Sequence, residues 1–345
     1  MLDDLKYMHE KDQADALGIV SKQGDQLRQT YTFDHPVSGE SVANVVLAGM
    51  GGSALAALLL RTWPGLSKPF EIVRDYDVPP YVGGDTLFIA SSYSGNTEET
   101  LSALAAAEAR GAVIAVIASG GKLAELAQTK QYPLALLPYV DQPRYAVLYN
   151  FAALLQILEQ AGLLPAGKTG PELVRAAAYL DGAVAAWQPT VPTTKNPAKQ
   201  LALECIGKSV VIYGGPKMYP AAYKWKISFN ENAKQVAWVN QLPEFNHNEF
   251  IGWSKQPVDK PYTVIELRSP LEHERVQKRF AVTERLLSGL RPAPLVVTAE
   301  GNTLLEQLLW TSAFGDFVSI YTALCNGINP APVDLVERFK KELEK

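Results

Sequence analysis

Short apolar runs alternate with longer stretches of helical periodicity along the first half of the chain. The short runs are typical of buried strands, and segments of about ten to fifteen residues between them have the apolar spacing of helices. This alternation predicts a parallel sheet with helices on both faces. After an N-terminal helix, the expected strands are 44–48, 70–73, 87–91, 112–118 and 134–137, and the expected helices are 53–63, 98–110, 122–129 and 144–161.

The second half repeats the alternation after a turn-rich piece, residues 162–171, and three prolines, Pro189, Pro192 and Pro197. The sequence therefore predicts an α/β protein with two doubly wound parallel sheets. The expected domains are 1–165 with the N-terminal helix, 166–197 as linker and helix, 198–326, and a C-terminal helix in 327–345. In the second half, the expected strands are 210–213, 235–239, 263–267 and 295–298, and the expected helices are 220–230, 275–290 and 303–324.

Composition narrows the class of protein. The 345 residues suit two domains, and 47% hydrophobic with 20% charged residues describes a globular chain. A net charge of −4 without a block of lysine or arginine argues against nucleic acid or an anionic membrane as the partner. The acidic start lacks the apolar core of a signal peptide, and no apolar run is expected to span a membrane, so a cytoplasmic protein is predicted.

Cysteine and histidine give no sign of metal or disulfide chemistry. Cys205 and Cys325 are far apart and each has apolar neighbours, which suggests neither a zinc site nor a disulfide framework. The four histidines do not have the spacing of metal ligands. We therefore expect no metal.

The segment Ser91 to Thr100 is rich in hydroxyl groups and follows the apolar run 86–90. A buried strand that ends in such a turn and continues as a helix brings short neutral donors and backbone N–H groups to one place. This arrangement can hold a phosphate monoester without a metal. The alternative is a turn that merely caps the helix, with Asn96 or Thr97 at the cap.

The first strand ends in Gly49-Met50-Gly51-Gly52-Ser53-Ala54, which also fits the dinucleotide fingerprint G-x-G-x-x-A. Asp75, at the end of the next strand, is then a candidate for binding a ribose. A nicotinamide enzyme is therefore an alternative. The hydroxyl turn on a neighbouring strand favours a compact monoester, because a dinucleotide usually keeps that opening clear for its second half.

Two residues of the second half are candidates for proton transfer. Glu231 ends an expected helix, and His247 follows a short expected strand. A carboxylate can act as a base, and an imidazole titrates near neutrality. Taken in isolation, each would more often be a surface polar group, but the density of asparagine, glutamate and histidine around them argues against that interpretation.

Five motifs follow one another along the chain. They are Gly49-Met50-Gly51-Gly52-Ser53, Ser92-Tyr93-Ser94-Gly95-Asn96-Thr97, Pro143-Arg144, Asn230-Glu231-Asn232-Ala233-Lys234, and Pro243-Glu244 leading to His247-Asn248. With these motifs in this order, the chain from about Asn44 onward resembles the bifunctional phosphoglucose/phosphomannose isomerase family of the phosphoglucose isomerase superfamily. The resemblance implies two sugar isomerase (SIS) domains of flavodoxin-like, three-layer α/β/α fold.

The resemblance implies a cofactor-independent aldose-ketose isomerase that acts on glucose or mannose 6-phosphate and fructose 6-phosphate. It implies that Glu231 is the isomerisation base, that Arg144 lies against the developing enediolate, and that His247 and Lys340 open the sugar ring. It also implies a homodimer in which His247 reaches the partner's site. The residues implied to hold the phosphate are Gly51, Gly52, Ser53, Ser92, Ser94 and Thr97.

One position departs from the family pattern. Some relatives carry a small hydroxyl residue between the Asn-Pro turn and the lysine, whereas this chain has Val333 within Ala331-Pro332-Val333-Asp334. The balance between glucose and mannose substrates is therefore open.

Three other functions remain as alternatives. A non-catalytic SIS protein that binds sugar phosphates would keep the hydroxyl turn but would not need Glu231, His247 and Arg144 together. An NAD-dependent enzyme would use the turn from Gly49 to Ala54, here called the glycine turn. A glucosamine-phosphate synthase would carry a glutaminase domain with a nucleophilic cysteine, whereas this chain begins almost directly with the first sheet.

Overall fold

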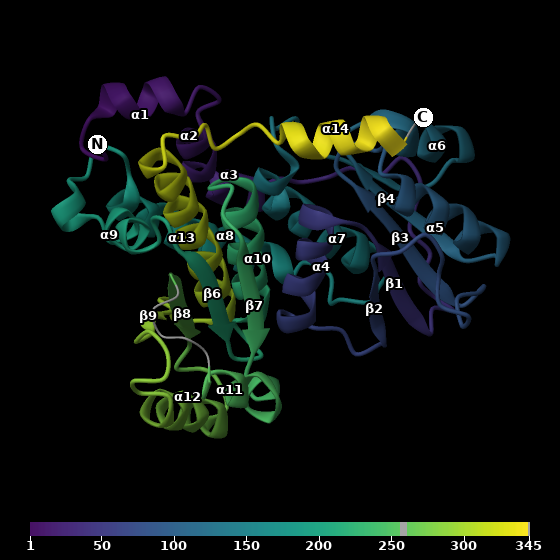
Figure 1. Cartoon of the computed structure of the whole chain (residues 1–345). Helices are drawn as coiled ribbons and strands as arrows, with labels where there is room; N and C mark the ends of the chain where they lie inside the picture. The colour runs from purple at the N-terminus through teal and green to yellow at the C-terminus, as the bar shows by residue number, and fades with distance from the viewer. Residues whose placement is uncertain (256–260, 344–345) are drawn as a thin grey trace. The chain divides into compact units, whose positions relative to one another are not determined.

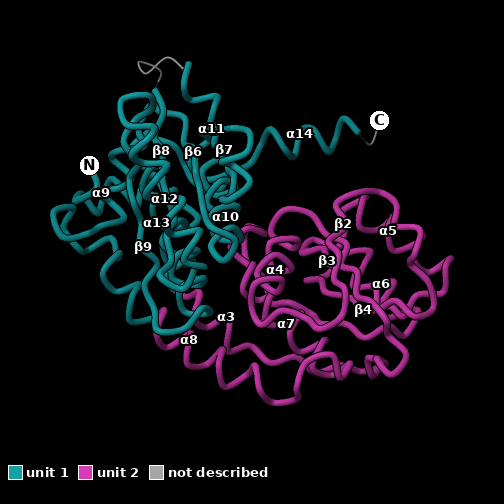
Figure 2. Tube along the Cα trace, turned by 90° about the horizontal axis from the view of Figure 1, so that it is seen from below, with its two compact units in different colours: residues 1–21, 181–345 teal, residues 22–180 magenta. Residues whose placement is uncertain are grey.

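The computed structural model describes residues 1–255 and 261–343. The chain divides into two compact units, shown in Figure 2: an N-terminal unit of residues 22–180 and a C-terminal unit of residues 1–21 and 181–345. Residues 1–21 thus belong with the second half of the chain. Tyr7 Oη donates to the carbonyl of Leu324 at 2.9 Å, and Asp3 Oδ1 accepts from Thr193 N at 2.8 Å. The units are therefore not continuous in sequence, unlike the expected domains.

The N-terminal unit is built on a parallel sheet with the strand order β2-β1-β3-β4-β5, of which Figure 1 labels the first four. The central strand, β3, has all seven residues buried, as expected of a strand covered on both faces. The strands are β1 (Asn44–Ala48), β2 (Phe70–Val73), β3 (Thr86–Ser92), β4 (Val113–Ala118) and β5 (Leu134–Leu136).

Helices cover both faces of this sheet. On one face, Phe88 and Val116 pack with Leu104 of α5 and Leu123 of α6 in a common core. On the other, α4 and α7 contact each other, and α7 contacts β4. The helices are α3 (Gln23–Leu27), α4 (Gly51–Thr62), α5 (Glu98–Ala109), α6 (Gly121–Lys130), the 3₁₀ turn η1 (Pro143–Tyr145), α7 (Val147–Gln160) and α8 (Thr169–Val184), whose last residues belong to the C-terminal unit.

The C-terminal unit repeats this topology with one strand fewer, in the order β7-β6-β8-β9. The core on one face joins Val211 and Tyr213 of β6 to Val276 and Phe280 of α12. On the other side, α10 packs on β6 and β7 and against α13. The strands are β6 (Ser209–Gly214), β7 (Ala237–Gln241), β8 (Tyr262–Arg268) and β9 (Leu295–Thr298).

The remaining helices surround this second sheet or extend from it. The C-terminal helix, α14, has no buried residue in its described part. The helical elements of the C-terminal unit are α1 (Leu5–Lys11), α2 (Ala16–Ser21), η2 (Ala185–Trp187), η3 (Thr193–Lys195), α9 (Pro197–Glu204), α10 (Tyr219–Glu231), η4 (Glu244–His247), α11 (Glu249–Gly252), α12 (Glu274–Leu286), α13 (Leu304–Cys325) and α14 (Asp334–Leu343).

The sequence prediction needs a correction at α13. Within the described residues, this helix is long and apolar enough to cross a bilayer by length and composition, although no run of that kind was expected. The most apolar stretch of α13 is 94% buried inside the unit. Its length and hydropathy therefore fit the central helix of a folded domain.

The fold class is confirmed: both units are parallel α/β sheets of the doubly wound kind. The order 2-1-3-4-5 of the first sheet is the flavodoxin-like order, which reverses direction between its first and third strands. In such a sheet, ligands bind outside the carboxyl ends of the strands at this switch point. The carboxyl ends of β1 and β3 are therefore the place to look for a site.

Candidate active site

The turn between β1 and α4 forms one side of the switch point. Gly51 begins α4 with φ of +49°, a left-handed conformation that favours glycine. Gly52 packs so closely against η1 that a Cβ atom there would lie 3.0 Å from the carbonyl oxygen of Pro143. No side chain caps the N-terminus of α4. Its first N–H groups and the helix dipole can therefore serve an anion.

The hydroxyl-rich turn after β3, residues 92–97, forms the other side of the switch point. Ala48 of β1 pairs with Ala90 of β3, so the two turns leave the same edge of the sheet. Ser92 Oγ and Thr97 Oγ1 lie 2.8 Å apart, and Gly95 N donates to Ser92 Oγ at 3.1 Å. Thr97 occupies the N-cap position of α5, but its side chain makes no capping hydrogen bond. The capping interpretation therefore does not account for the Thr97 hydroxyl.

The neighbouring turn between β4 and α6 braces the hydroxyl turn. Gly95 has φ of +70°, and a Cβ atom there would lie 1.8 Å from the carbonyl oxygen of Gly120. Lys122 N donates to Asn96 Oδ1 at 3.1 Å, and Leu123 N donates to the carbonyl of Gly95 at 2.9 Å. The backbone of the turn is thus fixed in place, while the Ser94 side chain remains exposed.

Arg144 lies beside the glycine turn. Its Cα atom is 3.5 Å from the position that a Cβ atom of Gly52 would take. The side chain is buried, with Nη1 donating to Gln142 Oε1 at 3.0 Å and the guanidinium 4.7 Å from the centre of the Tyr145 ring. The N-terminal unit therefore brings together the two turns that carry all six candidate phosphate ligands, and places Arg144 next to one of them.

The matching turn of the second sheet is occupied by a side chain of the protein itself. Glu272 Oε1 accepts from Lys217 N at 2.8 Å and from Met218 N at 3.3 Å, immediately before α10. Burial raises the pKa of Glu272 above its usual range, against the lowering effect of these two bonds. The turn after the first strand is thus filled by the Glu272 carboxyl group in the C-terminal unit, whereas the corresponding turn of the N-terminal unit has no side-chain cap.

Glu231, His247 and Lys340 all belong to the C-terminal unit. Glu231 is the last residue of α10, and Lys234 Nζ donates to its carbonyl at 2.8 Å. The same ammonium donates to the carbonyls of Asn329 and Pro330 at 3.2 and 3.0 Å. The loop after Glu231 is thereby joined to the turn that leads towards α14.

Lys340 lies on the exposed face of α14 and pairs with Glu337 at 2.8 Å. Val333 directly precedes that helix. The catalytic role of Lys340 stays a prediction.

His247 lies at the other end of the second sheet from Glu231. Glu231 ends the helix that leads into β7, whereas His247 belongs to η4, which follows β7. The strand has five residues, which corresponds to roughly 16 Å. The His247 side chain is exposed. One C-terminal unit therefore does not bring its own His247 to its own Glu231.

Burial disfavours nucleophilic chemistry at both thiols. Burial raises the pKa of Cys205 to about 12 and that of Cys325 to about 11, which disfavours the nucleophilic thiolate at neutral pH. Among residues 1–255 and 261–343, no group of three or more histidine, cysteine and acidic residues could hold a metal ion.

Sequence reasoning missed the residues that support the site. Gly120 and Gly121 fix the hydroxyl turn, and Glu272 fills the second turn, but each acts from a distant part of the chain. The pair Gly120-Gly121 lies between an apolar run and an expected helix, and this position was the signal that could have revealed its support of the hydroxyl turn.

The chain is similar in sequence to known proteins. The model of the bacterial phospho-glucose isomerase C-terminal SIS domain matches residues 194–343. The bifunctional phosphoglucose/phosphomannose isomerase of Caldicellulosiruptor bescii is 35% identical, over 92% of this chain and 96% of its own length. The protein of that name from Aquifex aeolicus is 33% identical, over 87% and 90%.

A solved structure has the same fold. The glucose-6-phosphate isomerase like protein of Thermus thermophilus matches 97% of this chain and 99% of its own, with a TM-score of 0.61 and 20% sequence identity. This similarity concerns the fold, whereas the sequence relatives show the family. The chain belongs to the family of bifunctional phosphoglucose/phosphomannose isomerases, which are enzymes.

Proposed function

We propose that the protein interconverts glucose 6-phosphate and mannose 6-phosphate with fructose 6-phosphate, without a cofactor and through a cis-enediol intermediate. The observation that carries the proposal is the 35% identity to an isomerase of that name over 92% of the chain. The anion-binding geometry at the switch point of the first sheet agrees with a phosphorylated substrate.

The phosphate is held in the N-terminal unit in this proposal. Backbone N–H groups at Gly51 and Gly52 and the hydroxyls of Ser94 and Thr97 are its donors, with Ser53 beside them. Ser92 completes the site by donating to Thr97 Oγ1, which leaves the Thr97 proton for the phosphate. Phosphate binding anchors the end of the sugar that does not react, so its binding energy can hold C1 and C2 against the catalytic groups. The second sheet offers no equivalent site, because Glu272 already occupies its turn.

The chemistry is proton transfer. His247 and Lys340 open the pyranose ring by moving protons to the ring oxygen and from the C1 hydroxyl. Glu231 then removes the proton from C2 and returns it to C1, while Arg144 stabilises the charge on the enediol. The two aldose phosphates differ only in configuration at C2 and give the same enediol, so one base serves both. Val333 adjusts the preference between them.

The active form that we propose is a homodimer in the cytoplasm. The wide separation of Glu231 and His247 along the second sheet supports a site that takes its histidine from a second copy. In a two-fold dimer, each copy would supply one histidine and receive one.

The test is a coupled assay of the purified protein with fructose 6-phosphate in the presence of EDTA. We expect both glucose 6-phosphate and mannose 6-phosphate to form. Tight binding of sugar phosphates without turnover would instead favour a non-catalytic binding protein. A change in nicotinamide fluorescence on mixing with NADH would favour the dinucleotide interpretation of the glycine turn.

A further inference from the structure

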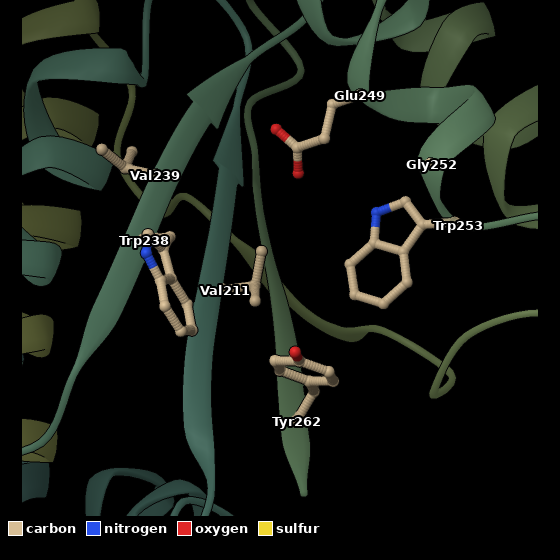
Figure 3. Close-up of a pocket in the computed structure, with 7 residues that line it drawn as sticks. All are labelled: Val211, Trp238, Val239, Glu249, Gly252, Trp253 and Tyr262. Atoms are coloured by element: carbon tan, nitrogen blue, oxygen red, sulfur yellow. The ribbon is translucent and has the colours of Figure 1, made fainter. Parts of the chain in front are cut away.

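A cavity of about 370 Å³ opens within the C-terminal unit, between α11 and the strands β6, β7 and β8 (Figure 3). Its volume is at the lower end of the range for small-molecule sites. None of the proposed substrate-binding or catalytic residues lines it. The lining residues are Val211, Trp238, Val239, Glu249, Gly252, Trp253 and Tyr262.

Three of the seven lining residues are aromatic. The Tyr262 ring lies 6.4 Å from that of Trp238 at an interplanar angle of 61°, and 5.8 Å from that of Trp253 at 83°. Figure 3 shows the two tryptophans on opposite sides of Val211, with Tyr262 at one end. Rings set at steep angles around one space resemble the aromatic cages that hold ammonium groups against their π faces.

Glu249 is the one charged side chain among the residues that line the cavity. In Figure 3, Glu249 lies at the end opposite Tyr262, and its carboxylate points towards the space between the tryptophans. Tyr213 Oη donates to Oε1, and Asn240 Nδ2 donates to Oε2 at 2.7 Å. Burial raises the pKa of the Tyr213 hydroxyl above its usual range, so Tyr213 remains a neutral donor. Two neutral donors thus fix the carboxylate without neutralising its charge.

Within the described part of the chain, no cationic side chain pairs with this charge: the guanidinium of Arg291, 5.6 Å from the centre of the Tyr213 ring, pairs instead with Glu266. Glu249 forms no ion pair with any residue of the described part of the chain. Trp253 Nε1 donates to Tyr213 Oη at 3.0 Å, so Trp253 offers the cavity its ring and not its N–H group. The cavity therefore combines aromatic faces with one negative charge, a setting that repels a sugar phosphate and attracts an organic cation.

We propose that this cavity binds a small organic ammonium ion, with its alkylated nitrogen between the rings of Trp238, Trp253 and Tyr262 and its charge facing Glu249. The site is separate from the sugar-phosphate site and does not depend on the isomerase activity. Half of the Trp238 surface is exposed, which gives the ligand a way in.

The test compares choline with 3,3-dimethylbutan-1-ol, its neutral isostere of nearly the same shape, by calorimetric titration of the full-length protein. We expect saturable binding of choline, with the alcohol bound about tenfold or more weakly, as a cation–π site with a carboxylate requires. Lack of saturable choline binding up to about 50 mM would overturn the proposal. Equal affinity for the two compounds would do the same, as would saturable binding of unphosphorylated glucose in place of choline.

Two variants locate the binding. Glu249→Gln should weaken choline about tenfold while leaving the alcohol unchanged, and Trp238→Leu should weaken both. Trp238 is half exposed on an edge strand, so its replacement keeps the proposal testable if Glu249→Gln does not fold. Glu274→Gln removes an acidic group outside the cavity and is the matched control, with wild-type affinity expected. Choline binding that survives both cavity variants would contradict the assignment.

Discussion

The side-chain amide of Asn232 donates to Ser319 Oγ at 2.9 Å, one residue beyond the candidate base Glu231. Both partners are fully buried, and Ser319 Oγ in turn donates to the carbonyl of Asp316. The end of α10 is thereby tied to the middle of α13. The buried ion pair of Lys224 with Asp316 joins the same two helices about two turns earlier along α10.

Ser319→Ala should therefore disturb the position of Glu231 as well as the fold. Loss of the acceptor leaves the buried Asn232 amide short of one partner, which costs about 1 to 3 kcal/mol of unfolding free energy. We also expect kcat for fructose 6-phosphate to fall more than KM rises, because the base loses its alignment. Urea unfolding and steady-state kinetics measure the two effects.

The control lies on the same helix. Ser312 is buried and its hydroxyl has no hydrogen-bond partner among the described residues, so Ser312→Ala should change neither kcat nor stability by much. A Ser319→Ala enzyme with reduced stability but wild-type kcat would limit Ser319 to a structural role.

Glu231→Gln should keep the affinity for sugar phosphates and lower turnover by roughly 10² to 10⁴-fold, the usual share of a positioned general base. Exchange of the C2 proton with deuterium from solvent should fall in parallel, since the same group removes that proton. Glu300→Gln, an exposed carboxylate elsewhere in the C-terminal unit, is the control. Normal C2 exchange in the Glu231 variant would remove this residue from the role of base.

Ser94→Ala combined with Thr97→Ala should weaken the binding of every phosphorylated sugar and leave the fold intact. The Thr97 hydroxyl does not cap α5, and Ser94 is exposed, so neither side chain is needed for the core. KM should rise with little change in kcat if the phosphate is held equally in the ground and transition states. Thr129→Ala, on the exposed side of α6, should behave as wild type. Unchanged affinity for inorganic phosphate in the double variant would show that the phosphate lies elsewhere.

The sequence alone predicted the sheets well, because the pattern that marks a buried strand lies within the strand itself. The buried run 86–90 and its neighbours are continuous and apolar because both faces of a parallel sheet are covered, and this signal needs no tertiary information. The order of the strands within each sheet was harder to predict from the residues than the strands themselves. The hydroxyl turn and the glycine turn could be expected at one sheet edge because both follow strand ends.

What the sequence could not predict depends on contacts between distant segments. Glu272 reaches the turn before α10 from more than fifty residues away, and nothing in its local pattern marks it as buried. The position of Ser319 beneath Asn232 is of the same kind. The apolar length of α13 was also underestimated, since polar residues such as Asp316 interrupt it in sequence but pair inside the unit.

Glu272 gives a prediction for pH. Burial raises its pKa in the folded protein above that of the unfolded chain, so the folded state favours the protonated carboxyl. Its contribution to stability is therefore fully present below the unfolded pKa and is lost as pH rises through the folded pKa. Glu272→Gln is neutral at all pH values and can still accept the two N–H bonds. The unfolding free energy of the variant minus that of wild type should thus increase between about pH 4 and pH 7. Urea titrations at matched ionic strength measure this difference, and a decrease over the same range would contradict the assigned environment.

The separation of Glu231 from His247 along β7 makes the shared site testable by mixing. Glu231→Gln and His247→Ala subunits should each be nearly inactive alone. Random exchange makes about half of the dimers mixed, and in each mixed dimer one site has both wild-type residues while the other has neither. Activity should therefore recover to about a quarter of wild type if the histidine acts across the interface. If Glu231 and His247 served the same site from one subunit, every site in the mixture would lack one of them. Subunit exchange must be followed independently, for example with differently tagged copies. Mixtures that exchange subunits and stay inactive would rule out the shared site. They would leave the isomerase assignment untouched.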